Sequence, residues 1–463
     1  FNGFSIDAKY SDLNELMSIP GVKNVRVSEV YDPIKPMIST AEEQTGVTAV
    51  QNNLGYSGEG QVIAIIDSEF DVGHEFFASA PENPKYSKSD ISSIINNTSL
   101  SANVTANQVY KNAKIPFAYD YGCGDDSVFD NRSALIHGSH VAGIAAGKNG
   151  KLSDGTLFSG VAPEAQLILM KITNASGGLP EAAILAALDD SAKFGVSAVN
   201  MSFGSDYASS KFASGYDSVL KNAKNAGILL SVSAGNASRG YKDKTPLTAD
   251  IDYSASGTPA EFTYSTSVAS SDNSIGYATL GKLIFSDSGS VKYAPAHTGS
   301  NFYSKFYNNQ YEYAYCGYGA AGDFSDASGK IALVRRGKLS FVDKAENAAA
   351  AGAAGIIIWN SENDYLNTVE LSLPAAVVTS DDGQILFDRT QKTVRAGYPS
   401  TQSYLSPTAG LVSSYSSWGT SDSLELTPEI TAPGGNIYSS VPDNKYSIMS
   451  GTSMAAPHLT GIT

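Results

Sequence analysis

The sequence predicts an α/β fold with a doubly wound parallel sheet, into which a β-rich domain is inserted. Residues 62–66 (Val-Ile-Ala-Ile-Ile) form a continuous apolar run, which is typical of a parallel strand buried on both faces. Strand-like segments then alternate with helix-like segments of about 10–15 residues. This alternation stops near Ser274, and a region rich in Tyr, Ser and Gly continues to about Pro407.

The alternating segments place several polar residues at the ends of strands. We expect helices at His137–Ala146, Pro180–Phe194 and Lys211–Ala226, and strands at Ala165–Ile172, Val196–Met201 and Ile228–Val232. In such sheets the functional residues collect at the carboxyl ends of the strands. Asp67, Ser202 and Asn236 all follow predicted strands, so we expect them at one edge of the sheet.

The length of 463 residues suggests two or three domains. Residues 1–31 form a small α+β unit, with a strand at Phe4–Ala8, a short helix capped by Asp12, and a second strand containing Val25 and Val27. A proline-punctuated linker follows at 32–45. The main domain then comprises 46–273 and 408–463, and the inserted domain comprises 274–407. The insert has one helix–strand unit, Phe341–Ala354 followed by 355–359.

Composition and charge exclude several classes of protein. The net charge of −15 disfavours nucleic acid as a partner, and the hydrophobic content of 42% argues against wholesale disorder. The longest apolar run, 348–359, is far shorter than the roughly 20 residues of a membrane helix, so we predict no transmembrane segment in this chain. Cys123 and Cys316 are expected to be unpaired thiols. The chain lacks an initial Met and stops ten residues after Ser453, so we expect both ends to be cut.

Ser453 is the candidate nucleophile. It lies in Gly451-Thr-Ser-Met-Ala-Ala-Pro457, a glycine-led turn followed by a small-residue helix. The backbone N–H of a serine there lies among the unpaired donors of the first helical turn, which can stabilise a developing oxyanion. Pro457 is expected early enough in the helix for its missing N–H to be tolerated. The alternative is a serine that merely caps a buried helix.

Two further residues complete a candidate triad. A serine needs a base, and His137 lies in His-Gly-Ser-His-Val-Ala-Gly, where His140 is expected to be buried and structural. Asp67 would orient the imidazole; alternatively, it caps the turn after its strand. The order Asp, His, Ser is one that catalytic triads adopt.

The remaining site candidates follow two other predicted strands. Asn236 would be the second oxyanion donor, and its alternative is a turn asparagine. Ser202, Phe203 and Gly204 would form an extended edge for substrate, with Ala234 and Gly235 beside it; alternatively, the first three simply end a core strand.

These motifs resemble those of the subtilisin-like serine proteases. The resemblance rests on 65–68 (Ile-Ile-Asp-Ser), 137–143, 234–236 (Ala-Gly-Asn) and 451–457, and it covers nearly the whole chain. It implies a serine endopeptidase acting through an acyl-enzyme, with Asp67, His137 and Ser453 as the triad and with Asn236 and the Ser453 N–H as the oxyanion hole. No catalytic cofactor is implied, and structural calcium is left open. Glu69 and Ser139 stand where the family usually has Gly and Thr.

The resemblance extends to the flanking segments. Residues 1–31 resemble the end of an inhibitory propeptide, which implies a zymogen cleaved within about 32–45. Residues 329–337 of the insert resemble a protease-associated domain. With 428–437, this insertion is similar to the cell-envelope proteases of Gram-positive bacteria. It implies an extracellular protein, secreted or attached to the cell wall, with protein or peptide substrates and its own propeptide as inhibitor.

Two other functions stay open at this point. A catalytically silent surface protein, used for binding or adhesion, could keep the same fold. Alternatively, the inserted domain could be the working part and the rest its scaffold.

Overall fold

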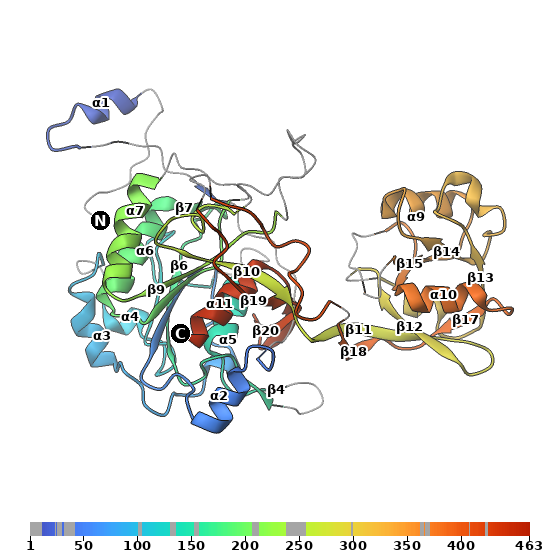
Figure 1. Cartoon of the computed structure of the whole chain (residues 1–463), viewed down its shortest axis with the longest axis horizontal. Coiled ribbons are helices and arrows are strands. Elements are labelled where there is room, and N and C mark those ends of the chain that lie inside the picture. Colours follow the sequence, from blue (N-terminus) through green and yellow to red (C-terminus); the bar gives the residue numbers. More distant parts are fainter. Residues whose placement is uncertain are drawn as a thin grey trace. The chain divides into compact units, whose positions relative to one another are not determined.

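The chain divides into two compact units (Figure 1). Unit 1 comprises Phe1–Ser274 and Thr408–Thr463, and unit 2 comprises Ile275–Pro407. The expected insertion at 274–407 has the same bounds to within one residue. The computed structural model describes residues 12–23, 25, 30–31, 42–100, 104–129, 136–151, 157–205, 213–237, 256–297, 300–361, 365, 371–406, 408–421 and 425–463.

The centre of unit 1 is a parallel sheet. Its described residues form seven strands in the order β19-β10-β9-β8-β2-β6-β3, and each neighbouring pair is parallel. The strands are β2 (Val62–Asp67), β3 (Phe117–Asp120), β6 (Gln166–Lys171), β8 (Ala198–Met201), β9 (Leu229–Ser233), β10 (Thr266–Asp272) and β19 (Ile430–Gly435). The predicted parallel sheet is therefore confirmed, and β19 completes one edge from the part of the chain after unit 2.

Helices cover both faces of this sheet (Figure 1). Val62, Ala64 and Ile66 of β2 pack with α3 (Lys88–Ile95), α4 (Ala106–Val109), α6 (Glu181–Lys193) and α7 (Ala213–Asn225). Ile63 and Ile65 pack on the opposite face, with α5 (His137–Ala146). The helix α11 (Thr452–Ile462) lies on this second face too, against β8, β9, β10 and β19. Because side chains alternate along a strand, β2, β3 and β6 each contribute to the cores on both faces.

Shorter elements complete unit 1. They are α1 (Leu13–Met17), β1 (Val30–Tyr31), α2 (Val47–Leu54), η2 (Glu75–Phe77), β4 (Gly150–Lys151), β5 (Leu157–Phe158), β7 (Leu179–Pro180), β20 (Ile437–Val441) and β21 (Lys445–Met449). The predicted helix near Asp12 is present as α1, but the Asp12 side chain makes no capping hydrogen bond to it. The predicted strand at Phe4–Ala8 lies outside the described residues, as does Val27.

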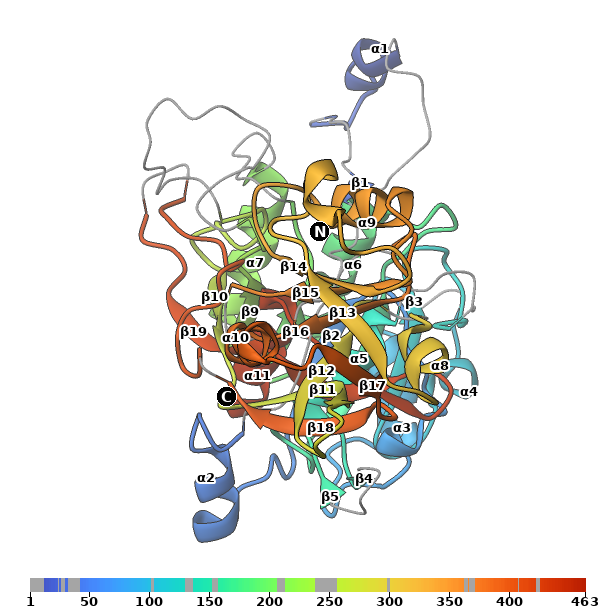
Figure 2. The same cartoon turned by 90° about the vertical axis from the view of Figure 1, so that its right-hand side faces the viewer.

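Unit 2 has a core on each side of a mixed sheet (Figure 2). Its strands follow the order β12-β16-β15-β14-β13-β17-β11-β18, and the helix α9 packs on one face while α8 and α10 pack on the other. The predicted helix–strand unit is α9 (Phe341–Ala350) and β15 (Gly355–Trp359). The other elements are β11 (Ile275–Ile284), β12 (Ser290–Pro295), α8 (Phe302–Phe306), β13 (Tyr311–Tyr315), η4 (Ala321–Phe324), β14 (Ile331–Arg335), β16 (Ala375–Val378), α10 (Ser380–Asp388), β17 (Thr393–Ala396) and β18 (Ser400–Leu405).

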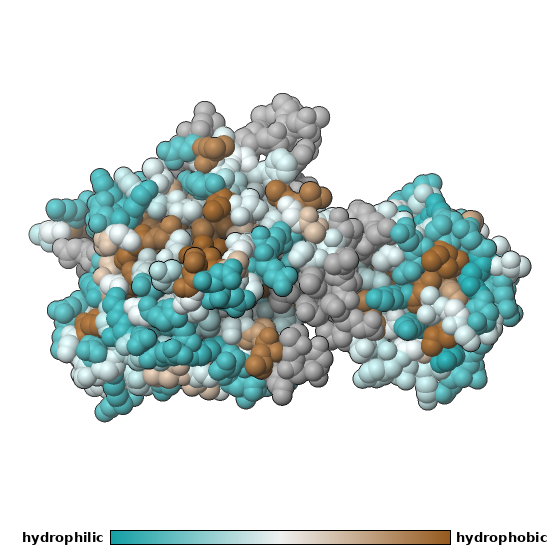
Figure 3. Space-filling model, turned by 60° about the horizontal axis from the view of Figure 1, so that its bottom comes forward, coloured by the Kyte–Doolittle hydropathy of each residue, from teal (hydrophilic) through white to brown (hydrophobic). Residues whose placement is uncertain are grey.

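The exposed apolar side chains are distributed in patches. On the face shown in Figure 3, small hydrophobic patches are separated by hydrophilic residues. Within the described part of the chain, no helix has the length and apolar character needed to cross a membrane.

Candidate active site

Asp67 and His137 meet at the carboxyl end of β2. Asp67 follows Ile63 and Ile65 at two-residue intervals, so its side chain lies on the α5 face of the sheet. His137 is the first residue of α5, and its Nδ1 lies 2.7 Å from Asp67 Oδ1. Both residues are buried, and the backbone N–H of Ser68 also donates to Asp67 Oδ1, at 2.7 Å. Among the described residues, His137 Nε2 has no hydrogen-bond partner, so it is free to accept a proton.

The start of α5 is fixed by a close backbone approach. A Cβ on Gly138 would lie 2.5 Å from the carbonyl oxygen of Glu69, so only glycine fits there. Glu69 itself, which stands where the family usually has glycine, is not among the residues with positive φ. The turn after β2 therefore needs no glycine, and the Phe70 N–H anchors it by donating to Val128 O at 2.9 Å.

Ser453 lies in the first turn of α11. The helix begins at Thr452 after an extended Gly451, whose N–H donates to Gly434 O at 2.9 Å. Ser453 Oγ donates to the backbone carbonyl of Ser202 at 3.2 Å rather than to His137. Because Ser202 follows β8, which pairs with β2 in the sheet, the first turn of α11 lies beside the strand that carries Asp67. The structure thus brings the helix of Ser453 and the helix of His137 to the same edge.

Ser202 also compensates for a proline in α11. Pro457 is the sixth residue of the helix, so its missing N–H would have had an acceptor within the helix and is tolerated only because another donor takes its place. A residue at this position would normally donate its N–H to the carbonyl of Ser453, four residues earlier. In its place Ser202 Oγ donates to Ser453 O at 2.7 Å, and Asn200 Nδ2 donates to Ser202 Oγ at 2.9 Å.

Asn236 is held through its amide oxygen by the residue before Ser453. Its Oδ1 accepts from the N–H of Thr452 at 3.0 Å and from Thr452 Oγ1 at 3.1 Å. A backbone N–H can only donate, so Oδ1 must face it and Nδ2 must point elsewhere. A Cβ built on Gly451 would lie 3.5 Å from Asn236 Nδ2 and 3.6 Å from Ser453 N. These two donors therefore flank one small space, which glycine leaves open.

The predicted substrate residues contribute unequally. The side chain of Phe203 is buried in the core on the α6 and α7 face, so only its backbone is left to meet a ligand. The N–H of Ala234 donates to Val268 O, and its carbonyl accepts from Gly257 N. The N–H of Gly235 donates to Thr452 Oγ1 at 3.1 Å, and its carbonyl accepts from Ser417 N. Ala234 and Gly235 thus support the site, and Gly204 remains as an edge next to Ser202.

The sequence analysis missed a second edge, at β7. This short strand follows β6 through a turn in which Asn174 Oδ1 accepts from the N–H groups of Ser176 and Gly178. The segment β1 pairs with it in antiparallel fashion, Val30 opposite Pro180 and Tyr31 opposite Leu179. A strand of two residues has no detectable alternation, so the sequence carried no signal for it.

Two further histidines are buried near the candidate triad. Burial lowers the pKa of His140 to about 3, and the neighbouring His137 adds to this shift. Its Nε2 lies 3.2 Å from the carbonyl oxygen of Ser447, so the prediction of a buried structural residue is confirmed. Burial also lowers the pKa of His458 on α11 to about 4. Both rings are therefore neutral near pH 7.

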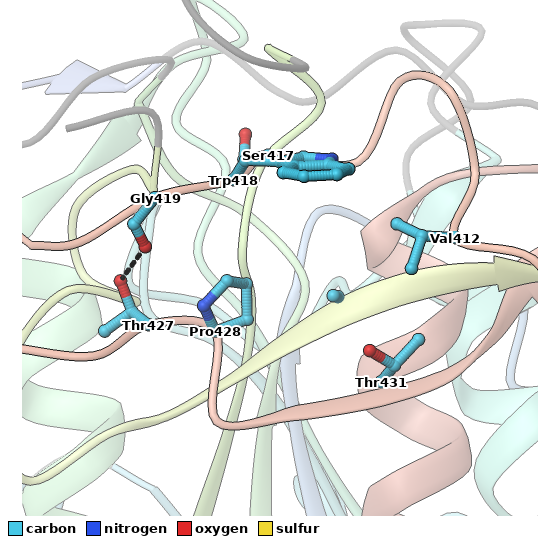
Figure 4. A pocket seen from close by; sticks show the side chains of 8 residues that line it. Val412, Ser417, Trp418, Gly419, Thr427, Pro428 and Thr431 are labelled. Atoms are coloured by element: carbon cyan, nitrogen blue, oxygen red, sulfur yellow. Dashed lines mark hydrogen bonds between the residues drawn. The ribbon is translucent and has the colours of Figure 1, made fainter. Parts of the chain in front are cut away.

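A pocket of about 240 Å³ in unit 1 does not belong to this site. Ala269 and Thr431, which are register partners on β10 and β19, line it. Their neighbours Val268 and Ala432 pack against α11, so the pocket lies on the opposite face of the sheet. Trp418, Pro428 and Val412 surround it (Figure 4).

The described residues show no evident metal site. No group of three or more His, Cys, Asp or Glu is placed among them to hold an ion, and structural calcium remains a prediction. Cys123 is exposed and Cys316 is buried, and both are free thiols, as predicted.

Comparison with known proteins identifies relatives over almost the entire chain. The profile of the Subtilase family matches residues 58–463. The PI-type proteinase of Lactococcus lactis subsp. cremoris is 33% identical over 490 residues, which cover 99% of this chain and 25% of that protein. The C5a peptidase of Streptococcus pyogenes is 33% identical over 459 residues, covering 96% of this chain and 37% of that protein. The chain thus spans about a quarter to a third of the length of these relatives. Among solved structures, the psychrophilic subtilisin-like protease Apa1 of Pseudoalteromonas sp. AS-11 aligns with a TM-score of 0.46 at 19% identity, over 90% of this chain and 85% of that one.

Proposed function

Because the chain belongs to the subtilase family, we propose that it is a serine endopeptidase that hydrolyses peptide bonds of proteins through an acyl-enzyme. The observation that carries this proposal is the buried 2.7 Å contact between Asp67 Oδ1 and His137 Nδ1, with Nε2 left unpartnered. An imidazole held at one nitrogen by a carboxylate has its other nitrogen available as a base.

The three residues would act in sequence. Rotation of the Ser453 side chain away from the carbonyl of Ser202 would bring its hydroxyl toward His137 Nε2. His137 would take the hydroxyl proton as Oγ attacks the peptide carbonyl, and would then give it to the leaving amine. Asp67 would hold the imidazole in the required tautomer and stabilise the imidazolium. Hydrogen bonds of this kind are often formed only with substrate bound.

Asn236 Nδ2 and the Ser453 N–H would stabilise the oxyanion. Both face the space beside Gly451, and the N–H groups of a first helical turn have no acceptor within the helix. Donors that are already oriented cost no reorganisation as the negative charge develops.

The substrate would bind as an extended strand between two edges. One is the backbone of residues 203–204, and the other is β7. The antiparallel pairing of β1 with β7 supports this assignment, since it shows that an extended segment can add to that edge. We further propose that residues 1–31 are the end of an inhibitory propeptide and that cleavage within 32–45 releases the mature enzyme.

The relatives suggest where the protein acts. The proteinases of Lactococcus and the C5a peptidase of Streptococcus come from Gram-positive bacteria. We propose that this protein is likewise extracellular, either secreted or attached to the cell wall, and that unit 2 is a protease-associated domain that contributes to substrate choice.

Labelling with a fluorophosphonate probe would test the proposed activity, because such probes react with an activated serine. The test would use the full-length protein with the propeptide removed, and Ser453→Ala as control. We expect labelling of the parent and none of the variant. If the parent is not labelled, the enzyme proposal fails and a catalytically silent binding protein takes its place.

A deletion would test the role of unit 2. Leu280 pairs with Ser400 on neighbouring strands, so a tight turn between them would replace the rest of the unit. We expect the deleted protein to keep its fluorophosphonate labelling and to lose only selectivity among protein substrates. Loss of labelling would indicate that unit 2 is part of the catalytic machinery.

A further inference from the structure

Three charged residues form a row at the carboxyl edge of the parallel sheet. Lys171 is the register partner of Asp67 on the neighbouring strand, and Asp120 is the register partner of Lys171 on the next strand. Leu169 and Ala118, two residues before Lys171 and Asp120, pack in the core on the α5 face. Because side chains alternate along a strand, Lys171 and Asp120 lie on the same face as Asp67.

Lys171 and Asp120 form a buried ion pair. Nζ lies 2.6 Å from Asp120 Oδ2, and each side chain is only 1% exposed. The other oxygen of Asp120 accepts from the N–H of Gly122 at 2.8 Å and of Cys123 at 3.0 Å. Asp120 is therefore fixed by backbone donors, and it fixes the ammonium of Lys171 in turn.

Asp67 has few partners of its own. Its Oδ1 accepts from Ser68 N and contacts His137 Nδ1, while its Oδ2 is buried and has no hydrogen-bond partner among the described residues. A buried carboxylate with so few donors is costly to keep ionised unless a positive charge lies nearby. The register of the sheet places the charge of Lys171 on the adjacent strand.

We propose that Lys171, held in place by Asp120, is a positioning residue whose positive charge, on the strand next to Asp67, sets the pH at which His137 becomes an active base. This inference rests on the proposed function, because it assigns Asp67 and His137 to the triad. Other titratable residues on the elements around the triad are Glu69 and Asp71 after β2, His140 on α5 and His458 on α11. The two histidines are neutral because burial lowers their pKa values to about 3 and about 4.

The two members of the pair have opposite effects in this proposal. Removing the positive charge of Lys171 favours the imidazolium, so His137 would lose its proton only at higher pH. Removing the negative charge of Asp120 disfavours the imidazolium and shifts this transition to lower pH. A unit charge about 10 Å away, at an effective dielectric constant of about 20, shifts such a transition by about one pH unit.

The test measures the rate constant of fluorophosphonate labelling between pH 5 and pH 9, which requires no knowledge of the cleavage preference. The variants are Lys171→Met, Asp120→Asn and the double variant. The matched control is Lys114→Met, which removes another buried lysine, whose Nζ donates to the carbonyls of Pro163 and Ala165. That lysine lies at the other end of β6, about 20 Å away along a strand of six residues.

We expect the acid limb of the profile to move up by about one pH unit in Lys171→Met and down by about half a unit in Asp120→Asn. The acid limb of the double variant should return toward that of the parent. The acid limb of Lys114→Met should equal that of the parent. A change in structure alone would not give shifts of opposite sign.

Equal acid limbs in the parent and the folded variants, or shifts in the same direction, would overturn the inference while leaving the serine activity intact. If Lys171→Met does not fold, the comparison of Asp120→Asn with the double variant tests the inference. The acid limb should then be shifted in Asp120→Asn and unshifted in the double variant. If the probe does not label the parent, the proposed function itself is refuted.

Discussion

Ser202 and Pro457 should be energetically coupled through the carbonyl of Ser453. In Ser202→Ala this buried carbonyl loses the hydroxyl that donates to it at 2.7 Å, and Asn200 Nδ2 loses its acceptor. Each unsatisfied buried group costs about 1–3 kcal/mol, so losing the partners of two groups should lower the free energy of unfolding of unit 1 by about 2–6 kcal/mol. Pro457→Ala restores an N–H that can donate to the same carbonyl.

The double variant should therefore be more stable than the two single effects predict. We expect a coupling free energy of about 1–2 kcal/mol, the worth of the recovered hydrogen bond. The control is Ser231→Ala, which removes a 2.8 Å hydrogen bond to the carbonyl of Ala456 in the same helix. Residue 457 does not donate to that carbonyl, so Ser231→Ala and Pro457→Ala should be additive.

Urea unfolding followed by tryptophan fluorescence would measure these effects. The chain has two tryptophans, one in each unit, so Trp359→Phe leaves Trp418 as the reporter of unit 1. All variants would carry Ser453→Ala, which prevents self-digestion and keeps the backbone carbonyl. Additivity of Ser202→Ala and Pro457→Ala to within about 0.5 kcal/mol would refute the reasoning, as would equal coupling in the control pair.

Three further predictions concern the site and its core. Asn236→Asp keeps the acceptor for the Thr452 N–H but loses the Nδ2 donor. The variant should therefore be as stable as the parent, while its turnover number falls about 10²–10³-fold, the loss known for such a donor in subtilisin. Gly451→Ala should also fold, because the extended backbone at position 451 suits any residue. The added methyl group would occupy the space between Asn236 Nδ2 and Ser453 N and should lower kcat at least about tenfold. An unchanged kcat would contradict this placement of the oxyanion. His458 stays neutral in the folded state down to about pH 4, whereas the unfolded chain takes up a proton below about pH 6.5. Stability should therefore fall as the pH drops through this window, by about 2 kcal/mol at pH 5 from this residue, and urea midpoints of His458→Met should fall less between pH 7 and pH 5 than those of the parent.

The sequence predicted the parallel sheet because its signals are local. The apolar run before Asp67 is long enough to indicate a strand buried on both faces, and the helices that follow have the length of crossover connections. The observed ends of these elements differ from the predicted ones by up to two residues, as in β8, which begins at Ala198 instead of Val196. In unit 2 the helix α10 was missed, since it begins in a polar segment, Ser380-Asp381-Asp382, that also suits a turn.

The parts of the site that the sequence could not supply depend on register and on which face a residue takes. Phe203 lies in a motif that suggests a substrate edge, but alternation directs its ring to the opposite core. Lys171 ends an apolar strand, where a lysine normally indicates the exit to solvent. Its burial against Asp120 follows only from the pairing of β3 with β6. Contacts across strands that are distant in sequence leave no local pattern.

The completion of the sheet by β19 and α11 from beyond unit 2 has a consequence for synthesis of the protein. His137 and Ser453 are separated by 316 residues (453 − 137), and unit 2 lies entirely between them. At about 5–20 residues per second, a ribosome needs roughly 16–60 seconds to pass from one to the other. During that time the nascent chain holds the proposed base and acid without the proposed nucleophile. With the proposed triad, the protein could not cut its own growing chain or the proteins around its ribosome until Ser453 has also emerged.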